Sequence, residues 1–395
     1  MSLSDLPLSY CTNVHPGRSV VEVEAGLDAC TVEVLGALGR PLAAGLWLAA
    51  PVIEELRQDT SARQRFIEGI GERGLVCYTL NAFPYGDFHG ERVKEQVYLP
   101  DWSAPARLQY TLACGDLLAA LLPEGVDGSI STVPLGFKHL PQGEDFQSRA
   151  IDALLDWSSQ MARRFDSCGR RVRLAIEPEP FCLLETTDET IGFFSTLFAE
   201  ADRRGMLDTA REYLGVCYDV CHQAVEFEDV AESIRRLDAD GIRINKVHIT
   251  CAIVLEDPAD NVEGRELLAG YVEPRYLHQT MARSRTGDVL RAVDLDAGLA
   301  RDPSPEWLAA ECWRVHFHVP VDAEDLGPLG TTRGELKRAL ASVINDLDYA
   351  PHLEVETYTW DVLPGGDRPD LVTGLVGELN ATAELLDEIS AADRA

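Results

Sequence analysis

Short apolar runs alternate with amphipathic stretches along almost the whole chain, and this alternation constrains the fold more than any other feature. The runs are rich in β-branched and apolar residues, as buried strands are, and the stretches between them are long enough for helices. Such alternation predicts a parallel sheet with helical crossovers. The expected strands are 8–14, 46–49, 75–82, 129–135, 172–180, 213–222, 242–250, 313–320 and 352–360. The expected helices are 52–71, 105–122, 147–166, 188–206, 228–239, 333–348 and 369–391.

Eight strand and helix units close a (β/α)8 TIM barrel, so nine expected strands leave one too many. We predict an α/β fold of this kind in which either 46–49 or 313–318 is accessory; the sequence leaves open which. We expect a single domain over 1–395 with an insertion at about 252–312, where acids, prolines and two helical patches interrupt the alternation. This insertion and the aromatic-rich segment 83–104 are expected to form a lid over the site.

The charge of the chain excludes some classes of partner. It has 35 Lys and Arg against 66 Asp and Glu, a net charge of −31, which repels nucleic acid phosphates and anionic membrane surfaces. The sequence has no apolar run long enough to span a bilayer and no secretory signal pattern, so we expect a cytoplasmic protein without nucleic acid or direct membrane insertion. The ten cysteines include no Cys-x-x-Cys pair, which favours buried thiols over a zinc knuckle or disulfides.

Polar side chains gather at or just past the ends of the expected strands. In a parallel barrel these ends meet at one face, where active sites are built, so residues distant in the sequence converge there. His278 and His352 are expected to be ordinary hydrogen-bonded residues. The histidines at strand ends are His15, His222, His248, His316 and His318, and the acids are Glu177, Glu179, Asp219, Glu354 and Glu356.

The spacing of these residues suggests metal ligands. His316 and His318 are two apart on an extended run and point to the same side. A buried carboxylate that ends an apolar run needs a cation, which applies to Glu177 and Glu356. Glu179 and Glu354 are their alternatives; Glu354 lies on the same side of its strand as Glu356, deeper in the barrel.

Asp219 and His222 have a spacing at which both side chains can face the barrel axis where a strand turns into a helix. The mixed carboxylate and imidazole set suits Zn, Mn, Co or Fe(II), as one ion or two. The expected ligands are Glu177, Asp219, His222, His248, His318 and Glu356.

The order of these residues over 177–356 resembles the xylose isomerase-like TIM barrel superfamily, which includes sugar isomerases, epimerases and endonuclease IV. More narrowly, YCTNVHPG at 10–17, FPYGDFHG at 83–90, EPRYLHQT at 273–280 and HLEVETYTW at 352–360 are similar to the EboE metabolite-traffic family. The superfamily resemblance implies metal ligation by Glu177, Asp219, His222, His248 and Glu356, and His318 stands where the second member of an Asp-x-His pair often does. His316 stands where that superfamily often has Asp, which leaves the number of metals and the role of His316 open. Contacts to substrate are expected from His15, Asn81, Lys138, Arg275 and His316.

The leading functional hypothesis is metal-assisted isomerisation or epimerisation of a sugar or cyclitol, with Glu177 and Glu356 as the catalytic bases. The basic residues Lys138, Lys246 and Arg275 could nevertheless form a local phosphate-binding pocket. One alternative is phosphodiester hydrolysis of the endonuclease IV kind, which the negative charge disfavours. Another is a metabolite carrier without turnover, as an EboE-type role in secondary metabolism implies. The superfamily resemblance also makes a homo-oligomer an expected state.

Overall fold

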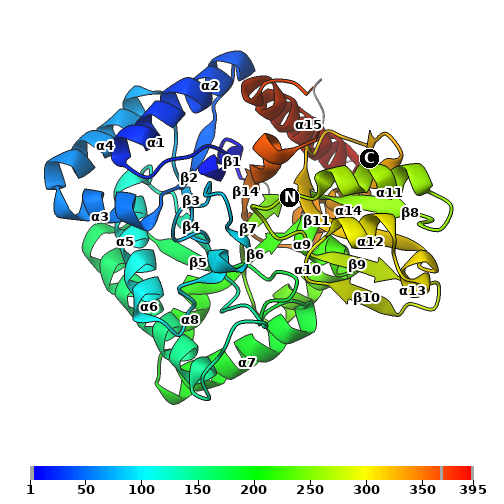
Figure 1. Ribbon diagram of the computed structural model, residues 1–395. Helices are drawn as coiled ribbons and strands as arrows, with labels where there is room; N and C mark the ends of the chain where they lie inside the picture. Colours follow the sequence, from blue (N-terminus) through cyan, green and yellow to red (C-terminus); the bar gives the residue numbers. More distant parts are fainter. Residues whose placement is uncertain (1–3, 365–367, 393–395) are drawn as a thin grey trace.

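The computed structural model describes residues 4–364 and 368–392, and eight of its strands form one closed barrel (Figure 1). Each strand of the barrel pairs in parallel with its neighbours, and the last strand closes against the first. The predicted (β/α)8 TIM barrel is confirmed. The barrel strands are β1 (Ser9–Cys11), β2 (Ala43–Trp47), β3 (Thr79–Asn81), β4 (Gly128–Thr132), β5 (Val172–Ile176), β6 (Leu214–Asp219), β7 (Ile244–Ile249) and β14 (His352–Val355).

Helices surround these strands, as Figure 1 shows for α1 to α8 on one side of the molecule. Their apolar faces pack on the barrel, so the core is the layer between helices and strands. The helices around the barrel are α1 (Val20–Gly26), α2 (Val32–Leu38), α3 (Ala50–Gln58), α4 (Thr60–Glu72), α5 (Pro105–Leu121), α6 (Phe146–Cys168), α7 (Thr187–Arg203), α8 (Leu207–Tyr213), α9 (Val220–Val225), α10 (Val230–Ala239), α14 (Arg333–Asp346) and α15 (Leu371–Ala392).

Two helical segments differ from the expectation. The helix expected at 52–71 is broken at Asp59, whose Oδ1 accepts a hydrogen bond of 2.9 Å from the Ala62 amide and caps α4. Residues 20–38, for which no helix is expected, form α1 and α2 joined by the π-helical turn η2 (Leu27–Thr31). Three short 3-10 helices follow barrel strands: η1 (Thr12–Val14), η3 (Lys94–Tyr98) and η5 (Tyr358–Val362).

A second sheet lies between β7 and α14 in the chain, on the other side of Figure 1 from α1 to α8. Its pairs are antiparallel, in the order β10-β9-β11-β8-β13-β12. The run at 313–318 belongs to this inserted sheet and is the accessory one, whereas 46–49 overlaps β2. The strands are β8 (Cys251–Glu256), β9 (Thr280–Arg283), β10 (Val289–Ala292), β11 (Cys312–Val319), β12 (Asp325–Leu326) and β13 (Leu329–Thr331).

The helical patches expected at 263–284 and 305–313 are helical only in part. The first begins as α11 (Val262–Leu268) and η4 (Ala269–Tyr271) and ends in β9, because β9 pairs with β11. The others are α12 (Ala297–Arg301) and α13 (Pro305–Leu308). Across the part of the chain that the structure describes, no helix is both long and apolar enough to cross a membrane. All ten cysteines are free thiols, and only Cys168 is exposed.

Candidate metal centre

A cluster of one histidine and three carboxylates lies at the C-terminal ends of four barrel strands. We call Glu177, Asp219, His248 and Glu356 the carboxylate cluster; each offers a ligand atom within 4.8 Å of the others. The four residues come from the ends of β5, β6, β7 and β14 and are all buried. The parallel barrel therefore brings together four of the expected ligands, from positions 177 to 356, as strand-end residues.

Histidine 248 lies at the centre of this cluster. Its Nδ1 atom is 3.1 Å from Glu177 Oε1, 3.1 Å from Glu356 Oε2 and 3.6 Å from Asp219 Oδ2. Burial acts to lower the pKa of His248, but the Cys217 thiol and the carboxylates of Glu356 and Glu177 together raise it well above its usual range. The metal-free cluster thus keeps a proton where a cation would otherwise balance its negative charge.

Asp219 divides its two oxygens between structure and site. Asp219 Oδ1 accepts hydrogen bonds from the His222 amide (3.1 Å) and the Thr250 hydroxyl (2.7 Å), and so caps α9. Its Oδ2 is buried and has no hydrogen-bond partner among the described residues. The same is true of Glu177 Oε2. Buried carboxylate oxygens without donors are costly, and a cation is a ligand that would satisfy them.

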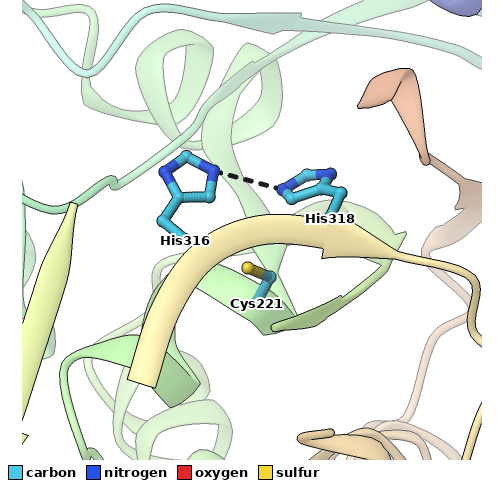
Figure 2. Close-up of side chains that lie close together, drawn as sticks. All are labelled: Cys221, His316 and His318. Atoms are coloured by element: carbon cyan, nitrogen blue, oxygen red, sulfur yellow. Dashed lines mark hydrogen bonds between the residues drawn. The ribbon is translucent and has the colours of Figure 1, made fainter. Parts of the chain in front are cut away.

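Three further imidazoles meet beside the carboxylate cluster. We call His222 (on α9), His316 and His318 (both on β11) the histidine trio. The Nε2 atom of His316 lies 3.1 Å from His222 Nε2 and 3.3 Å from His318 Nε2. Figure 2 shows His316 and His318 projecting from the same stretch of β11, with Cys221 close by. The pairing of β11 with β8 shifts register between Val315 and Val319, so a bulge carries both histidines.

In each histidine of the trio, the Nδ1 atom lies within hydrogen-bond distance of a carbonyl oxygen, which can only accept a hydrogen bond. The Nδ1 atoms face Pro178 O (2.9 Å, from His222), Gln279 Oε1 (2.7 Å, from His316) and Glu356 O (2.8 Å, from His318). The proton therefore sits on Nδ1, which leaves the Nε2 lone pair of His316 facing those of His222 and His318. Tetrahedral Zn–N bonds of about 2.0–2.1 Å hold nitrogens about 3.3 Å apart, close to the separation of His316 Nε2 from each of its two neighbours. The groups whose ligand atoms all lie within 4.8 Å of one another take the trio two at a time: Asp219 with His222 and His318, and Glu179 with His222 and His316.

Burial keeps His222 and His316 neutral. It lowers the pKa of His222 to about 4 and, together with the neighbouring His222 and His318, lowers that of His316 well below its usual range. Asp219 Oδ2 lies 3.8 Å from His318 Nε2, and Asp219, His222 and His318 offer ligand atoms within 4.8 Å of one another. Asp219 thus belongs both to the carboxylate cluster and to a group with the trio. Cys221, with a thiol pKa raised by burial, is a weaker donor beside His316 and His318.

The site opens into a small cavity of about 60 Å³. Its floor is formed by residues of the carboxylate cluster and the trio, and its walls come mostly from the two segments expected to form a lid, 83–104 and 252–312, with Tyr358 of η5 beside them. Apolar and aromatic side chains dominate these walls: Phe83, Phe88, Val93, Val97, Tyr276, Leu277 and Tyr358.

Lys94 joins the two wall segments. Its buried Nζ binds Glu273 O (3.1 Å), Tyr276 O (2.5 Å) and Asp294 Oδ2 (2.6 Å). The backbone amides of Val93 and Lys94 both donate to Arg275 O at 2.8 Å. This ammonium is the only cationic side chain among the described residues that line the cavity, and it is fully engaged.

The expected substrate contacts fall into two groups. Asn81 lines the cavity and donates from Nδ2 to Glu356 Oε1 at 2.8 Å, and His316 is part of the trio. His15, Lys138 and Arg275 do not line the cavity. Lys138 forms ion pairs with Glu185 and Glu189, and Lys246, considered for a phosphate pocket, is fully buried inside the barrel.

Residues that the sequence did not single out also shape the site. Asn13 Nδ2 donates to Glu356 Oε1 at 2.8 Å, beside the bond from Asn81. Gln279 Nε2 donates to Glu179 Oε1 at 3.1 Å, and Tyr98 donates to the same oxygen at 2.7 Å. Glu179 thus lies beside the trio rather than in the carboxylate cluster: its Oε1 is 3.6 Å from His316 Nδ1, and it offers a ligand atom within 4.8 Å of those of His222 and His316. Asn13 lies in the motif at 10–17 and could have been found as a polar strand-end residue; Gln279 carries no such signal.

Fold and site together define a TIM barrel with a buried carboxylate and histidine centre at the C-terminal ends of its strands. No protein-family model matches the chain, and no curated protein matches it. The structure of an L-ribulose 3-epimerase is similar, with a TM-score of 0.52 and 14% identity over 98% of this chain and 97% of that one.

Two further solved structures have the same architecture. A xylose isomerase-like TIM barrel protein from Mycobacterium smegmatis in complex with magnesium gives a TM-score of 0.52 and 14% identity over 99% of both chains. A D-tagatose 3-epimerase-like protein gives 0.50 and 11% over 98% of this chain and 99% of that one. At these identities the likeness shows the fold alone, a TIM barrel. The narrower resemblance to the EboE family stays a prediction.

Proposed function

We propose that the chain is a divalent-metal-dependent isomerase or epimerase that acts on a sugar or cyclitol. The observation that carries the proposal is the unpartnered Oδ2 of Asp219, which lies 3.6 Å from His248 Nδ1 and 3.8 Å from His318 Nε2, between two sets of ligand atoms. Glu177, Asp219, His248 and Glu356 would hold one ion, and Asp219, His222 and His318 a second. The epimerase and isomerase-like names of the similar structures support this class of reaction.

A divalent ion at the carboxylate cluster would polarise a carbonyl oxygen of the substrate and stabilise negative charge on it. Glu177 is suited to remove the adjacent proton, because burial raises its pKa to about 7, the residue lines the cavity, and its buried Oε2 has no hydrogen-bond donor among the described residues. Glu356 stays ionised: burial opposes this, but His248 and His318 lower its pKa, and Asn13 and Asn81 both donate to its Oε1. The two glutamates are the proposed proton carriers, on either side of His248.

The cavity walls serve the same chemistry by excluding water. Phe88, Tyr276 and Tyr358 pack against one another above the site, with ring centroids 4.9–5.3 Å apart. A dry site strengthens the electrostatic interaction between the ligand set and a developing oxyanion. Because Lys94 is engaged, no free cation faces the cavity from the described residues, which favours a neutral substrate over a phosphate ester.

The histidine trio favours a second candidate, metal-dependent phosphodiester hydrolysis, since histidine-rich sites commonly hold a metal-bound nucleophile. The net charge of −31 and the lack of a free cation at the cavity weigh against it. The trio also suits a carrier that binds a metabolite without turnover. A role in an ebo-type pathway of secondary metabolism is part of this carrier hypothesis.

The test is metal loading followed by proton exchange. Protein loaded separately with Mn, Co and Zn is analysed for bound metal and thermal shift, then incubated in D2O with a panel of ketoses, aldoses and inositol-type ketones. Deuterium gained at the carbon next to the carbonyl, lost in Glu177→Gln, is the expected result. Binding without deuterium gain would favour the carrier, release of nitrophenol from bis-nitrophenyl phosphate would favour the hydrolase, and no metal uptake would reject all three.

A further inference from the structure

A buried ion pair lies inside the barrel beneath the carboxylate cluster. Lys246 on β7 and Glu354 on β14 are both fully buried, and Nζ lies 2.6 Å from Oε1. The interior of a TIM barrel is normally filled by branched apolar side chains. Replacing a buried pair by apolar residues of similar volume is often neutral or stabilising. Stability alone therefore gives no reason for this pair.

The carboxylate of Glu354 is held in one place from several sides. Ser9 Oγ donates to its Oε2 at 2.9 Å. A Cβ atom added at Gly45 would lie 1.5 Å from the same oxygen, so the carboxylate occupies space that only a glycine leaves free. Lys246 Nζ is itself fixed by Ser131 Oγ at 3.3 Å and by Leu80 O at 3.5 Å. The orientation of Glu354 is thus determined by its surroundings.

The remaining neighbour of Glu354 is His248. Glu354 Oε1 lies 3.3 Å from His248 Nε2. Both atoms are buried, and neither makes a well-aligned hydrogen bond within the described part of the chain. On the other side of the ring, Nδ1 faces Glu177 and Glu356 at 3.1 Å each. The two nitrogens of His248 therefore face two different carboxylate environments.

We propose that Glu354, neutralised by Lys246, is a positioning residue that keeps a proton on Nε2 of His248 and so presents Nδ1 to the carboxylate cluster. An imidazole that ligates a metal through one nitrogen needs its proton on the other, and a carboxylate acceptor there fixes both tautomer and ring orientation. Lys246 removes the net charge that a lone buried carboxylate would add beneath the cluster. The part of this inference that concerns metal rests on the proposed function.

A matched pair of double variants separates this role from packing. Both Lys246→Met/Glu354→Leu and Lys246→Met/Glu354→Gln lack the ion pair, and only the glutamine keeps an oxygen that can accept from His248 Nε2. Zinc affinity is measured by competition with a chelator, and folding by circular dichroism and denaturant unfolding. We expect the leucine variant to bind zinc about 10- to 100-fold more weakly than the glutamine variant. Ser9→Ala, which removes only the bond to Oε2, should stay within a few-fold of wild type.

Equal zinc affinity in the two folded double variants would overturn the proposal and leave the pair as packing.

A readout without metal keeps the question apart from the proposed function. In ¹⁵N-histidine-labelled metal-free protein, the Nε2 proton of His248, assigned by loss in His248→Gln, should exchange slowly in wild type and in the glutamine variant. It should exchange fast in the leucine variant. Wild type that binds no zinc yet shows this pattern would reject the proposed function and keep the positioning role; slow exchange in all variants would reject the positioning role. If the leucine variant does not fold, the single variant Glu354→Gln is compared with wild type instead. Glu354→Gln keeps an oxygen that can accept from His248 Nε2, so fast exchange of the Nε2 proton in this variant would contradict the proposal.

Discussion

His222 and His316 present unprotonated Nε2 atoms to each other at 3.1 Å, because the Nδ1 proton of each is committed to a carbonyl oxygen of Pro178 or Gln279. Two imidazole lone pairs at this separation repel each other and cannot hydrogen-bond. The arrangement is maintained by second partners that come from distant parts of the chain. It is the geometry expected if the imidazoles serve as ligands to an ion, as we propose, and it can be tested residue by residue.

Asp219→Asn should remove zinc binding with little change in folding. The asparagine keeps an oxygen to cap α9 and to accept from Thr250, and loses the charge that faces His248 and His318. We expect a loss of affinity of at least about 100-fold, measured by chelator competition. His15→Asn is the matched control, since His15 lies outside the cavity, and it should bind as wild type. Full zinc occupancy in Asp219→Asn would contradict the ligand assignment.

Glu179→Gln should flatten the pH dependence of stability of the metal-free protein. Burial raises the pKa of Glu179 to about 8 in the folded chain, against the ordinary value of 4.5 when unfolded. The folded state therefore binds more protons than the unfolded state between pH 4.5 and 8, so this group lowers the free energy of unfolding as pH rises through that window. The slope is about 1.4 kcal/mol per pH unit at most.

Urea unfolding at pH 5, 6.5 and 8 checks this. The difference in stability between Glu179→Gln and wild type should move in favour of the variant from pH 5 to pH 8. Glu144→Gln, at an exposed position, serves as the control and should give a difference that does not change with pH. A constant difference for Glu179→Gln as well would show that Glu179 is already ionised throughout the range.

Lys94→Met should loosen the two wall segments without affecting the metal. The variant removes the ammonium that binds Glu273 O, Tyr276 O and Asp294. Hydrogen exchange of residues 88–98 and 273–277 should rise about 10-fold or more, a change equivalent to about 1.4 kcal/mol. Lys337→Met, which removes an exposed lysine paired at 3.5 Å with Glu388, is the control. Unchanged exchange in Lys94→Met would mean that the amides of Val93 and Lys94 hold the segments by themselves.

Gly45→Ala should destabilise the barrel severely. The new methyl group would lie 1.5 Å from Glu354 Oε2, inside a core that cannot make room without breaking the contact to Ser9. We expect a loss of about 3 kcal/mol or more in the free energy of unfolding. Gly36→Ala on α2 has nothing within 4 Å of the added atom and should stabilise by about 0.5–1 kcal/mol. Similar stability in the two variants would show that the interior yields easily around Glu354.

Strand-end residues were the part of the site that the sequence could predict. Glu177, Asp219, His248 and Glu356 follow or end barrel strands, and the parallel topology alone brings them together. The depth of Glu354 below Glu356 follows from alternation along β14. Gln279 could not be predicted as a partner of His316, because their contact depends on the pairing of β9 with β11, which is decided by packing between distant segments.

Helix α1 is a different kind of miss, since its signal was present. Buried positions Val20, Val23, Leu27 and Val34 recur at helical spacing, but the valines of VVEVE also suit a strand. The insertion at 252–312 was expected to form a lid, and deleting 258–304 within it would be a direct test of that expectation. That deletion would take β9 from the side of β11 and Gln279 from His316, so it would disturb the trio as well as the wall.

The origin of the ligands has a consequence for the order of assembly. The carboxylate cluster is complete once β5, β6, β7 and β14 have closed the barrel, whereas two of the three histidines arrive on β11, in the inserted sheet. An ion could therefore bind the barrel residues before the inserted sheet docks. An ion shared through Asp219 would link the inserted sheet to the barrel. Loss of metal from such a protein would then appear first as detachment of the inserted sheet, while the barrel stays folded.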